Sequence, residues 1–151
     1  MDIKSGNGFP SGSLSNFAPH PFVLDDIECT SMEGFLQSLK FSNPEMQKQV
    51  CSLKGRQAKA KGSKKNWQKN QTLYWNGKEY KRESEEYQKL LDRAYYALSK
   101  NASFRKALLA TGNANLTHSI GKRKPQETVL TAQEFTSRLM MLRDEIKKEN
   151  I

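Results

Sequence analysis

The sequence predicts a single compact α+β domain in which helices predominate over a few short strands. Three observations support this class. The chain has 151 residues, enough for one domain with a substantial core, and carries 2 Trp, 7 Phe and 5 Tyr to fill it. About five stretches repeat apolar residues at helical spacing, and turn residues join pairs of short apolar segments. The domain is expected over residues 14–148, after a flexible lead-in over residues 1–13 that is rich in Gly and Ser.

Short strands are expected in three places. Residues 22–24 and 27–29 flank Asp25-Asp26, a pattern typical of a tight hairpin. Thr72–Tyr80 forms a second hairpin, because Asn-Gly is the preferred two-residue turn between strands. Residues 115–120 are expected to add one further short strand.

Helices are expected wherever a capping residue precedes apolar residues spaced three and four apart. The expected helices are 31–40 capped by Ser31 or Thr30, 43–54 capped by Asn43, 83–100, 101–111 capped by Asn101 and ended by Gly112, and a last helix on which Thr131 and Glu134 form a capping box.

The stretch Ser31–Lys40 is the most informative of these. Its apolar residues gather on one helix face, and Glu33, Gln37 and Lys40, spaced four and three apart, form a separate polar stripe beside them. A carboxylate, an amide and an ammonium in register could line a cleft. The alternative interpretation is a solvated helix face carrying weak surface charges.

The chain is strongly basic, with 25 Lys and Arg against 16 Asp and Glu, a net charge of +9 and a pI of about 9.6. Such a surface attracts anions, whether nucleic acid, phosphorylated ligands or anionic lipid. The segment Gly55–Lys65 predicts either a phosphate-contacting edge or a solvated basic helix and loop. The candidate phosphate or nucleic-acid patch consists of Lys61, Lys64, Lys65, Lys122, Arg123 and Lys124.

Aromatic and basic residues alternate between Trp67 and Arg82. Aromatic side chains set among cations can stack on nucleic-acid bases. A short hairpin also needs aromatic cross-strand pairs for its own stability. Both interpretations are open at this point, with packing slightly favoured.

Several classes of protein are disfavoured. Cys29 and Cys51 fit neither a disulfide framework nor a metal site, and His20 and His118 are too far apart in sequence to form a histidine-rich metal motif. We therefore expect no metal and no cofactor. No apolar run approaches the ~18 residues of a membrane span, and no signal-peptide core is visible. A cytoplasmic protein without a membrane partner is expected.

Several segments in order resemble the NADAR family of YbiA-like and RibX-like proteins. The resemblance starts with LSNF at Leu14–Phe17 and the PFVL segment at Pro21–Leu24. It continues through S-x-E-x-x-x-Q-x-x-K-F at Ser31–Phe41. Further matching segments are Ala58-Lys59 with Gly62 and Trp67, FRKALLATG at Phe104–Gly112, and SRLMMLRDEI at Ser137–Ile146. Their order and spacing together span most of the chain.

The resemblance implies a mainly helical α+β fold with one cleft and an N-glycosidase that cleaves a ribose–base bond. The implied substrates are ADP-ribosyl-guanine on nucleic acid or a ribosyl-phosphate intermediate of the riboflavin pathway, and the net charge favours the first. Glu33 is the expected catalytic carboxylate, and His118 is a weaker candidate for protonating the leaving nitrogen. The expected substrate-binding residues are Asn16, Phe17, Gln37, Lys40, Arg56, Lys59 and Trp67.

The chain departs from the family pattern in one place. A D-x-x-W-G stretch is expected after the segment that ends at Gly112, yet no Asp or Trp occurs between Gly112 and Gln126. Two alternatives to an active glycosidase follow. The first alternative is a module that binds ADP-ribose or a nucleotide without cleaving it. The second is a basic nucleic-acid-binding protein with a vestigial cleft.

Overall fold

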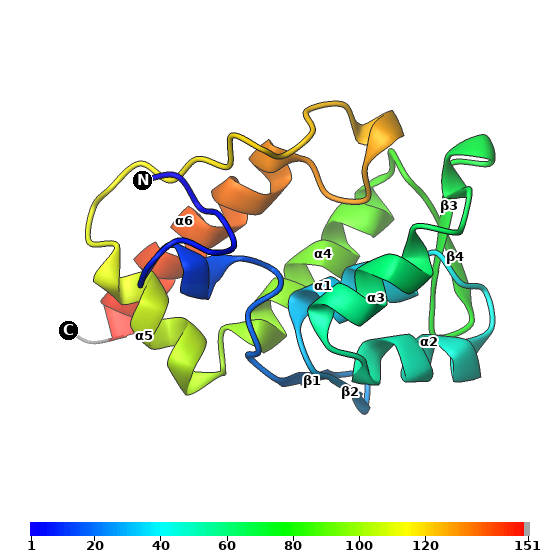
Figure 1. The fold of residues 1–151 in the computed structure, drawn as a ribbon, viewed down its shortest axis with the longest axis horizontal. Coiled ribbons are helices and arrows are strands. Elements are labelled where there is room, and N and C mark those ends of the chain that lie inside the picture. Colours follow the sequence, from blue (N-terminus) through cyan, green and yellow to red (C-terminus); the bar gives the residue numbers. More distant parts are fainter. Residues whose placement is uncertain (150–151) are drawn as a thin grey trace.

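Helix α4 runs through the middle of the molecule and separates two groups of elements (Figure 1). The computed structural model describes residues 1–149. On one side of α4 lie α5, α6 and both ends of the described chain, and on the other lie α1–α3 with the second hairpin. The α-helices are α1 Met32–Ser38, α2 Pro44–Ser52, α3 Gly55–Gly62, α4 Glu85–Leu98, α5 Ala102–Ala110 and α6 Ala132–Glu149. The strands are β1 Phe22–Leu24, β2 Ile27–Cys29, β3 Thr72–Trp75 and β4 Lys78–Lys81, and the 3-10 turns are η1 Gly12–Leu14, η2 Trp67–Lys69 and η3 Pro125–Glu127. The predicted fold class, α+β with helices predominant, is confirmed.

Both hairpins are antiparallel and close through residues in the left-handed region. Strand β1 pairs with β2 around Asp25 (φ 50°) and Asp26 (φ 64°). Strand β3 pairs with β4 around Asn76 (φ 50°) and Gly77 (φ 87°). Two successive residues with positive φ match the right-handed twist of the flanking strands, and Asn, Asp and Gly tolerate this conformation best. The two predicted hairpins are therefore present.

Two aromatic residues of the second hairpin, Trp75 and Tyr80, are core residues, while Tyr74 is half-buried. Trp75 is 2% exposed, its ring lies edge-on to Phe35 at 4.9 Å, and its Nε1 donates to Asp25 Oδ2 at 2.9 Å. Trp67 and Tyr80 are also buried. With Trp75 and Tyr80 buried in this way, the structure favours packing over nucleic-acid stacking for the hairpin.

The first thirteen residues are not the flexible lead-in that their composition predicts. Ile3 is fully buried, and its backbone N–H donates to the Thr117 carbonyl at 2.7 Å. The Asp2 carboxylate accepts hydrogen bonds from the backbone N–H and the hydroxyl of Ser119, at 2.8 and 2.6 Å. The predicted strand at 115–120 is wrong for a related reason, since this segment forms one isolated parallel bridge, between Asp2 and Thr117.

The segment that precedes α6 is held by a buried ion pair. Thr131 and Glu134 form the predicted capping box, with N–H to side-chain distances of 2.7 and 3.0 Å. The Arg82 guanidinium, 1% exposed, donates to both Glu134 oxygens at 3.1 and 2.6 Å and to the Thr128 carbonyl at 2.8 Å. This contact fixes residues 128–134 against the end of β4.

No helix within residues 1–149 is both long and apolar enough to cross a membrane.

Candidate functional site

Helix α1 carries Glu33 into the interior of the molecule. Ser31 caps the helix, because its extended backbone lets its hydroxyl accept from Gly34 N at 3.2 Å. The Glu33 backbone N–H donates to the Asn16 carbonyl at 2.9 Å, which ties the first turn to the LSNF segment. Glu33 is 9% exposed and Gln37 is 6% exposed. Two members of the predicted polar stripe are therefore buried rather than solvated. The third, Lys40, lies two residues beyond the end of α1, which is shorter than the predicted helix 31–40, and is half-buried.

A cavity of about 340 Å³ opens above this stripe. Its floor is α1, and its walls come from the LSNF segment, α3, η2 and the chain between residues 118 and 130. It brings together nine of the predicted site residues: Asn16, Phe17, Glu33, Gln37, Lys40, Lys59, Trp67, His118 and Lys122. We refer to this cavity as the cleft.

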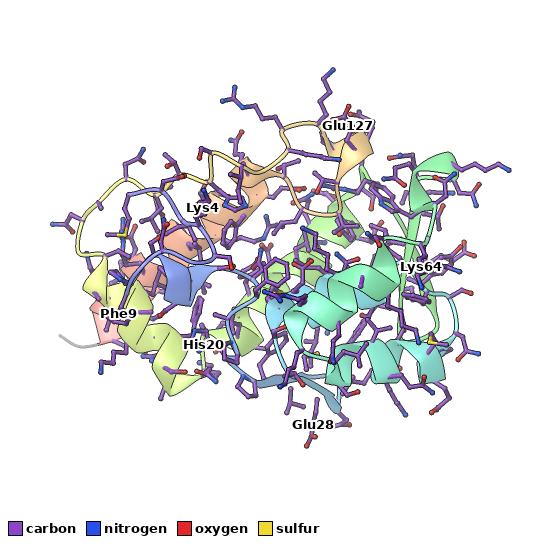
Figure 2. All side chains as sticks on the ribbon, in the orientation of Figure 1. Lys4, Phe9, His20, Glu28, Lys64 and Glu127 are labelled. Carbon is purple, nitrogen blue, oxygen red and sulfur yellow. The ribbon has the colours of Figure 1, made fainter. Side chains whose placement is uncertain are left out.

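The remaining predicted residues lie outside the cleft. Arg56 lines a second cavity of about 700 Å³, which shares Phe17 and Lys59 with the cleft. Lys64 and Lys65 line a third cavity of about 270 Å³, which shares Lys40 and Trp67 with the cleft. Figure 2 shows Lys64 just beyond α3, on the side of the second hairpin. The patch residues Lys61, Arg123 and Lys124 are exposed and line none of these three cavities.

The Glu33 carboxylate is oriented by a neighbour on its own helix. Gln37 Nε2 donates to Glu33 Oε1 at 2.8 Å, one helical turn away. The other atom of the amide, Gln37 Oε1, is buried against Gly62 of α3 and accepts no hydrogen bond from the described residues. A β-carbon at position 62 would lie 1.8 Å from this oxygen, so only glycine allows α3 to pack this closely. Helix α3 thus holds the Gln37 amide in the orientation that Glu33 needs.

The charges of the cleft counteract only part of the effect that burial has on the pKa of Glu33. Burial raises the pKa of Glu33, while the Gln37 amide and the ammonium groups of Lys59 and Lys40 act in the opposite direction and only partly offset it. Burial also lowers the pKa of Lys40, and so do the charges of Lys59 and Lys122, against the favourable field of Glu33. A carboxylate that takes up a proton more readily than usual therefore lies among cations.

His118 enters the cleft from the opposite wall. Its Nδ1 lies 2.7 Å from the Ile3 carbonyl, which can only accept, so Nδ1 carries the hydrogen. Its ring packs edge-on against Phe135 at 5.1 Å. Nε2 has no hydrogen-bond partner in the part of the chain that is described, which leaves this nitrogen for a ligand.

Asn16 is oriented by a residue that sequence reasoning missed. The hydroxyl of Tyr95, on α4, donates to Asn16 Oδ1 at 2.7 Å, and the Tyr95 side chain is 1% exposed. With its oxygen occupied, Asn16 presents its NH₂ group as the free end of the amide. Lys59 Nζ lies 5.4 Å from the centre of the Phe17 ring, a cation–π contact on the adjoining wall.

A second acidic residue at the cleft was also missed. Glu127 ends η3 and lines the cleft. It directly follows the segment from Gly112 to Gln126, which lacks the Asp of the D-x-x-W-G stretch. The sequence offers one local signal, a proline-initiated turn at Pro125, which does not indicate the cleft.

No group of three or more His, Cys, Asp or Glu side chains within residues 1–149 is placed to hold a metal ion.

Comparisons with known proteins agree with the predicted resemblance. The family model described as Bacteriophage protein GP30.3 matches residues 8–144. A relative from Enterobacteria phage T4, described as an uncharacterized 17.1 kDa protein in the Gp30-rIII intergenic region, is 39% identical over 149 residues, which is 97% of this chain and 98% of the relative. The NMR structure of the E. coli protein YbiA superimposes with a TM-score of 0.63 over 99% of this chain and 86% of YbiA, at 20% identity. The chain therefore belongs to the bacteriophage protein GP30.3 family and has the NADAR-type, YbiA-like fold.

Proposed function

We propose that this protein is an N-glycosidase of the NADAR type that cleaves a ribose–base bond. The proposed substrate is ADP-ribosyl-guanine on nucleic acid, from which ADP-ribose is released, or a ribosyl-phosphate intermediate. One observation carries the proposal: the buried carboxylate of Glu33 lies at the floor of a cleft that also presents the ammonium groups of Lys40, Lys59 and Lys122 and the amides of Asn16 and Gln37.

Glu33 is suited to act on the water that attacks the sugar. Cleavage passes through a state with positive charge at the anomeric carbon, which a nearby carboxylate stabilises. The raised pKa of Glu33 also makes it a better proton acceptor than an exposed glutamate, so it can take a proton from the attacking water. Because Nδ1 keeps its hydrogen on the Ile3 carbonyl, His118 protonates the departing base from Nε2 as an imidazolium and is left as the neutral Nδ1–H ring.

The other cleft residues fit the remainder of such a substrate. The Asn16 NH₂ group is a donor for ribose hydroxyls. Lys40, Lys59 and Lys122 are cations for phosphate groups. The second cavity continues from the cleft past Lys59 to Arg56, which suits the length of a diphosphate-linked ligand and offers a guanidinium for a forked contact.

A non-catalytic ADP-ribose-binding module is the second candidate. The missing D-x-x-W-G stretch favours it. Glu127 weighs on the other side, because it gives the cleft a second acidic group from the same region of the chain.

The test uses a DNA oligonucleotide that carries ADP-ribosyl-guanine and follows free ADP-ribose by mass spectrometry. Glu33→Gln keeps the size of the side chain and is expected to lower kcat by about 10²–10⁴-fold. The control is Glu28→Gln, an exposed glutamate on β2 that lies at the edge of the molecule opposite Glu127 (Figure 2). Release by the wild type and Glu28→Gln alone supports the proposal.

Two other results would contradict parts of this proposal. Equal release by Glu33→Gln removes Glu33 from the mechanism. If the wild type releases nothing from the oligonucleotide or from a ribosyl-phosphate intermediate, yet binds ADP-ribose in calorimetry, the binding module is correct.

A further inference from the structure

Ile120 is an exposed apolar side chain among the residues that line the cleft. It is 61% exposed, and among the large apolar side chains that the described residues leave exposed, it alone lines the cleft. The others, such as Met141 on α6, lie away from the cleft. An apolar side chain left exposed at the mouth of a cleft is available to pack against an apolar part of a bound ligand, such as the face of a base.

The turn that carries Ile120 is fixed rather than loose. The Gly121 backbone N–H donates to the His118 carbonyl at 3.0 Å, which closes the turn around Ile120. Ser119 is held through two hydrogen bonds to the Asp2 carboxylate. A β-carbon at Gly121 would lie 2.5 Å from His118 Cδ2, so the turn packs tightly on the histidine. The Ile120 side chain is thus presented at the rim in one defined place.

Cations lie beside this turn and along the cavity that adjoins the cleft. Lys122, Arg123 and Lys124 follow it directly and are exposed. Lys64 and Lys65 line the third cavity, which adjoins the cleft across Lys40 and Trp67. A chain of phosphates at the mouth of the cleft would therefore meet positive charge next to the Ile120 turn.

We propose that the Ile120 turn is a strand-contacting rim for single-stranded nucleic acid. Ile120 packs against the base next to the nucleotide held in the cleft, and the cations beside the turn contact the neighbouring phosphates. Apolar side chains of this kind insert at base steps in other nucleic-acid-binding proteins. A single strand is specified because a base that enters an enclosed cleft must leave its stack. The proposal deepens the proposed function by naming the carrier of the substrate, and it rests on that function only for the chemistry in the cleft.

A binding experiment tests the rim independently of turnover. Fluorescence anisotropy with a short, unmodified, labelled single-stranded DNA measures Kd for the wild type, Ile120→Ala and Met141→Ala. Met141 is the matched control, because it is equally apolar and 60% exposed. Ile120→Ala is expected to weaken binding about tenfold, since it removes most of one aliphatic contact. Met141→Ala should bind as the wild type does.

The salt dependence separates the apolar contact from the ionic ones. Ile120→Ala removes no charge, so the slope of log K against log salt should stay that of the wild type. Arg123→Ala should reduce the slope by about 0.7, the value for one phosphate contact on a single strand. The same slope in wild type and Arg123→Ala would show that Arg123 does not contact the strand, and would overturn that part of the proposal.

Turnover supplies the second test. Ile120→Ala should lower kcat/KM on an ADP-ribosylated oligonucleotide about tenfold more than on the corresponding modified nucleoside. Equal losses on both would reduce Ile120 to a wall of the cleft and overturn the proposal. The proposal would also be overturned if the wild type bound no oligonucleotide at about 50 mM salt, or if Ile120→Ala bound the oligonucleotide as tightly as the wild type. It would likewise be overturned if light scattering showed that Ile120→Ala dissociates a dimer. If neither substrate is turned over while Ile120→Ala still weakens binding, the glycosidase is wrong and the rim stands.

Discussion

Replacing Gly62 with alanine is expected to damage both the packing of α3 on α1 and the geometry of the cleft. The added β-carbon would lie 1.8 Å from Gln37 Oε1 and 2.8 Å from Gln37 Cδ, well inside van der Waals contact. The Gln37 amide must then move, and the 2.8 Å hydrogen bond that it donates to Glu33 is lost or distorted. A single methyl group on α3 thus acts on the proposed catalytic carboxylate through one intermediary.

The magnitude follows from opposing effects. Overpacking a buried site costs about 1–3 kcal/mol, and a hydrogen bond to a charged group contributes roughly 1.5–3 kcal/mol. Alanine offsets part of this, because it favours a helix by about 1 kcal/mol over glycine. We expect a net loss of about 2 kcal/mol in the free energy of unfolding, which lowers Tm by roughly 4–8 °C for a chain of this size.

Thermal and urea denaturation measure this loss, with Gly8→Ala as the control. Position 8 has no atom within 4 Å of an added β-carbon, so this change should leave stability within about 0.5 kcal/mol. The double variant Gly62→Ala/Gln37→Ala removes the clashing amide. Its loss of stability should be smaller than the sum of the two single losses, because the clash is relieved, and it should recover none of the lost turnover, since Glu33 still lacks its partner.

Strictly additive effects of the two substitutions would refute this reasoning, because two side chains that clash must couple. A Gly62→Ala variant with wild-type stability and wild-type turnover would refute it as well. It would mean that the Gln37 amide has a second position from which it still serves Glu33.

Two further predictions concern groups in the cleft. Burial raises the folded-state pKa of Glu33, so the native state binds more protons than the unfolded state above the ordinary value of 4.5, and stability falls as pH rises through that window. Glu33→Gln removes this loss, and its Tm should match that of the wild type at low pH and exceed it increasingly towards neutral pH; a constant difference would contradict the assigned cause. Tyr95→Phe removes the hydroxyl that orients Asn16 and should cost about 1 kcal/mol, while kcat/KM falls roughly tenfold. Steady-state kinetics and a thermal scan measure the two effects. If another variant with the same loss of stability, but with Tyr95 intact, lost kcat/KM equally, the positioning role of Tyr95 would be refuted.

The elements of the fold were largely predictable because their signals are local. The Asn-Gly turn, the Asn43 cap followed by proline, and the Thr131–Glu134 capping box each depend on residues within a few positions of one another. Propensity and capping chemistry therefore place them without knowledge of the rest of the chain. The polar stripe on α1 belongs to the same class, since helical spacing alone puts Glu33, Gln37 and Lys40 on one side.

The burial of that stripe was not predictable, because it depends on contacts between distant parts of the chain. Gly62 has to approach Gln37 from α3 before the stripe becomes the floor of a cleft rather than a solvated face. The opposite wall depends on Ile3, whose carbonyl holds His118 across 115 positions of sequence. A Gly- and Ser-rich composition indicates local freedom, and it does not reveal the one isoleucine that anchors the segment in the core.

The charges in the cleft differ in kind from the ion pair that holds the fold. Arg82 and Glu134 meet at 2.6 Å in a forked contact, with the guanidinium fully buried, as expected for a pair that stabilises structure. Glu33 is also buried, yet no lysine or arginine nitrogen of residues 1–149 comes within 4.0 Å of its carboxylate. Lys40 and Lys59 are close enough to act on its pKa and too far to form an ion pair. Burying a charge without a direct partner costs stability, so an arrangement of this kind serves a group that enters between the charges. A ribose beside the carboxylate, with phosphates towards the lysines, would occupy that space and complete the contacts that the fold leaves open.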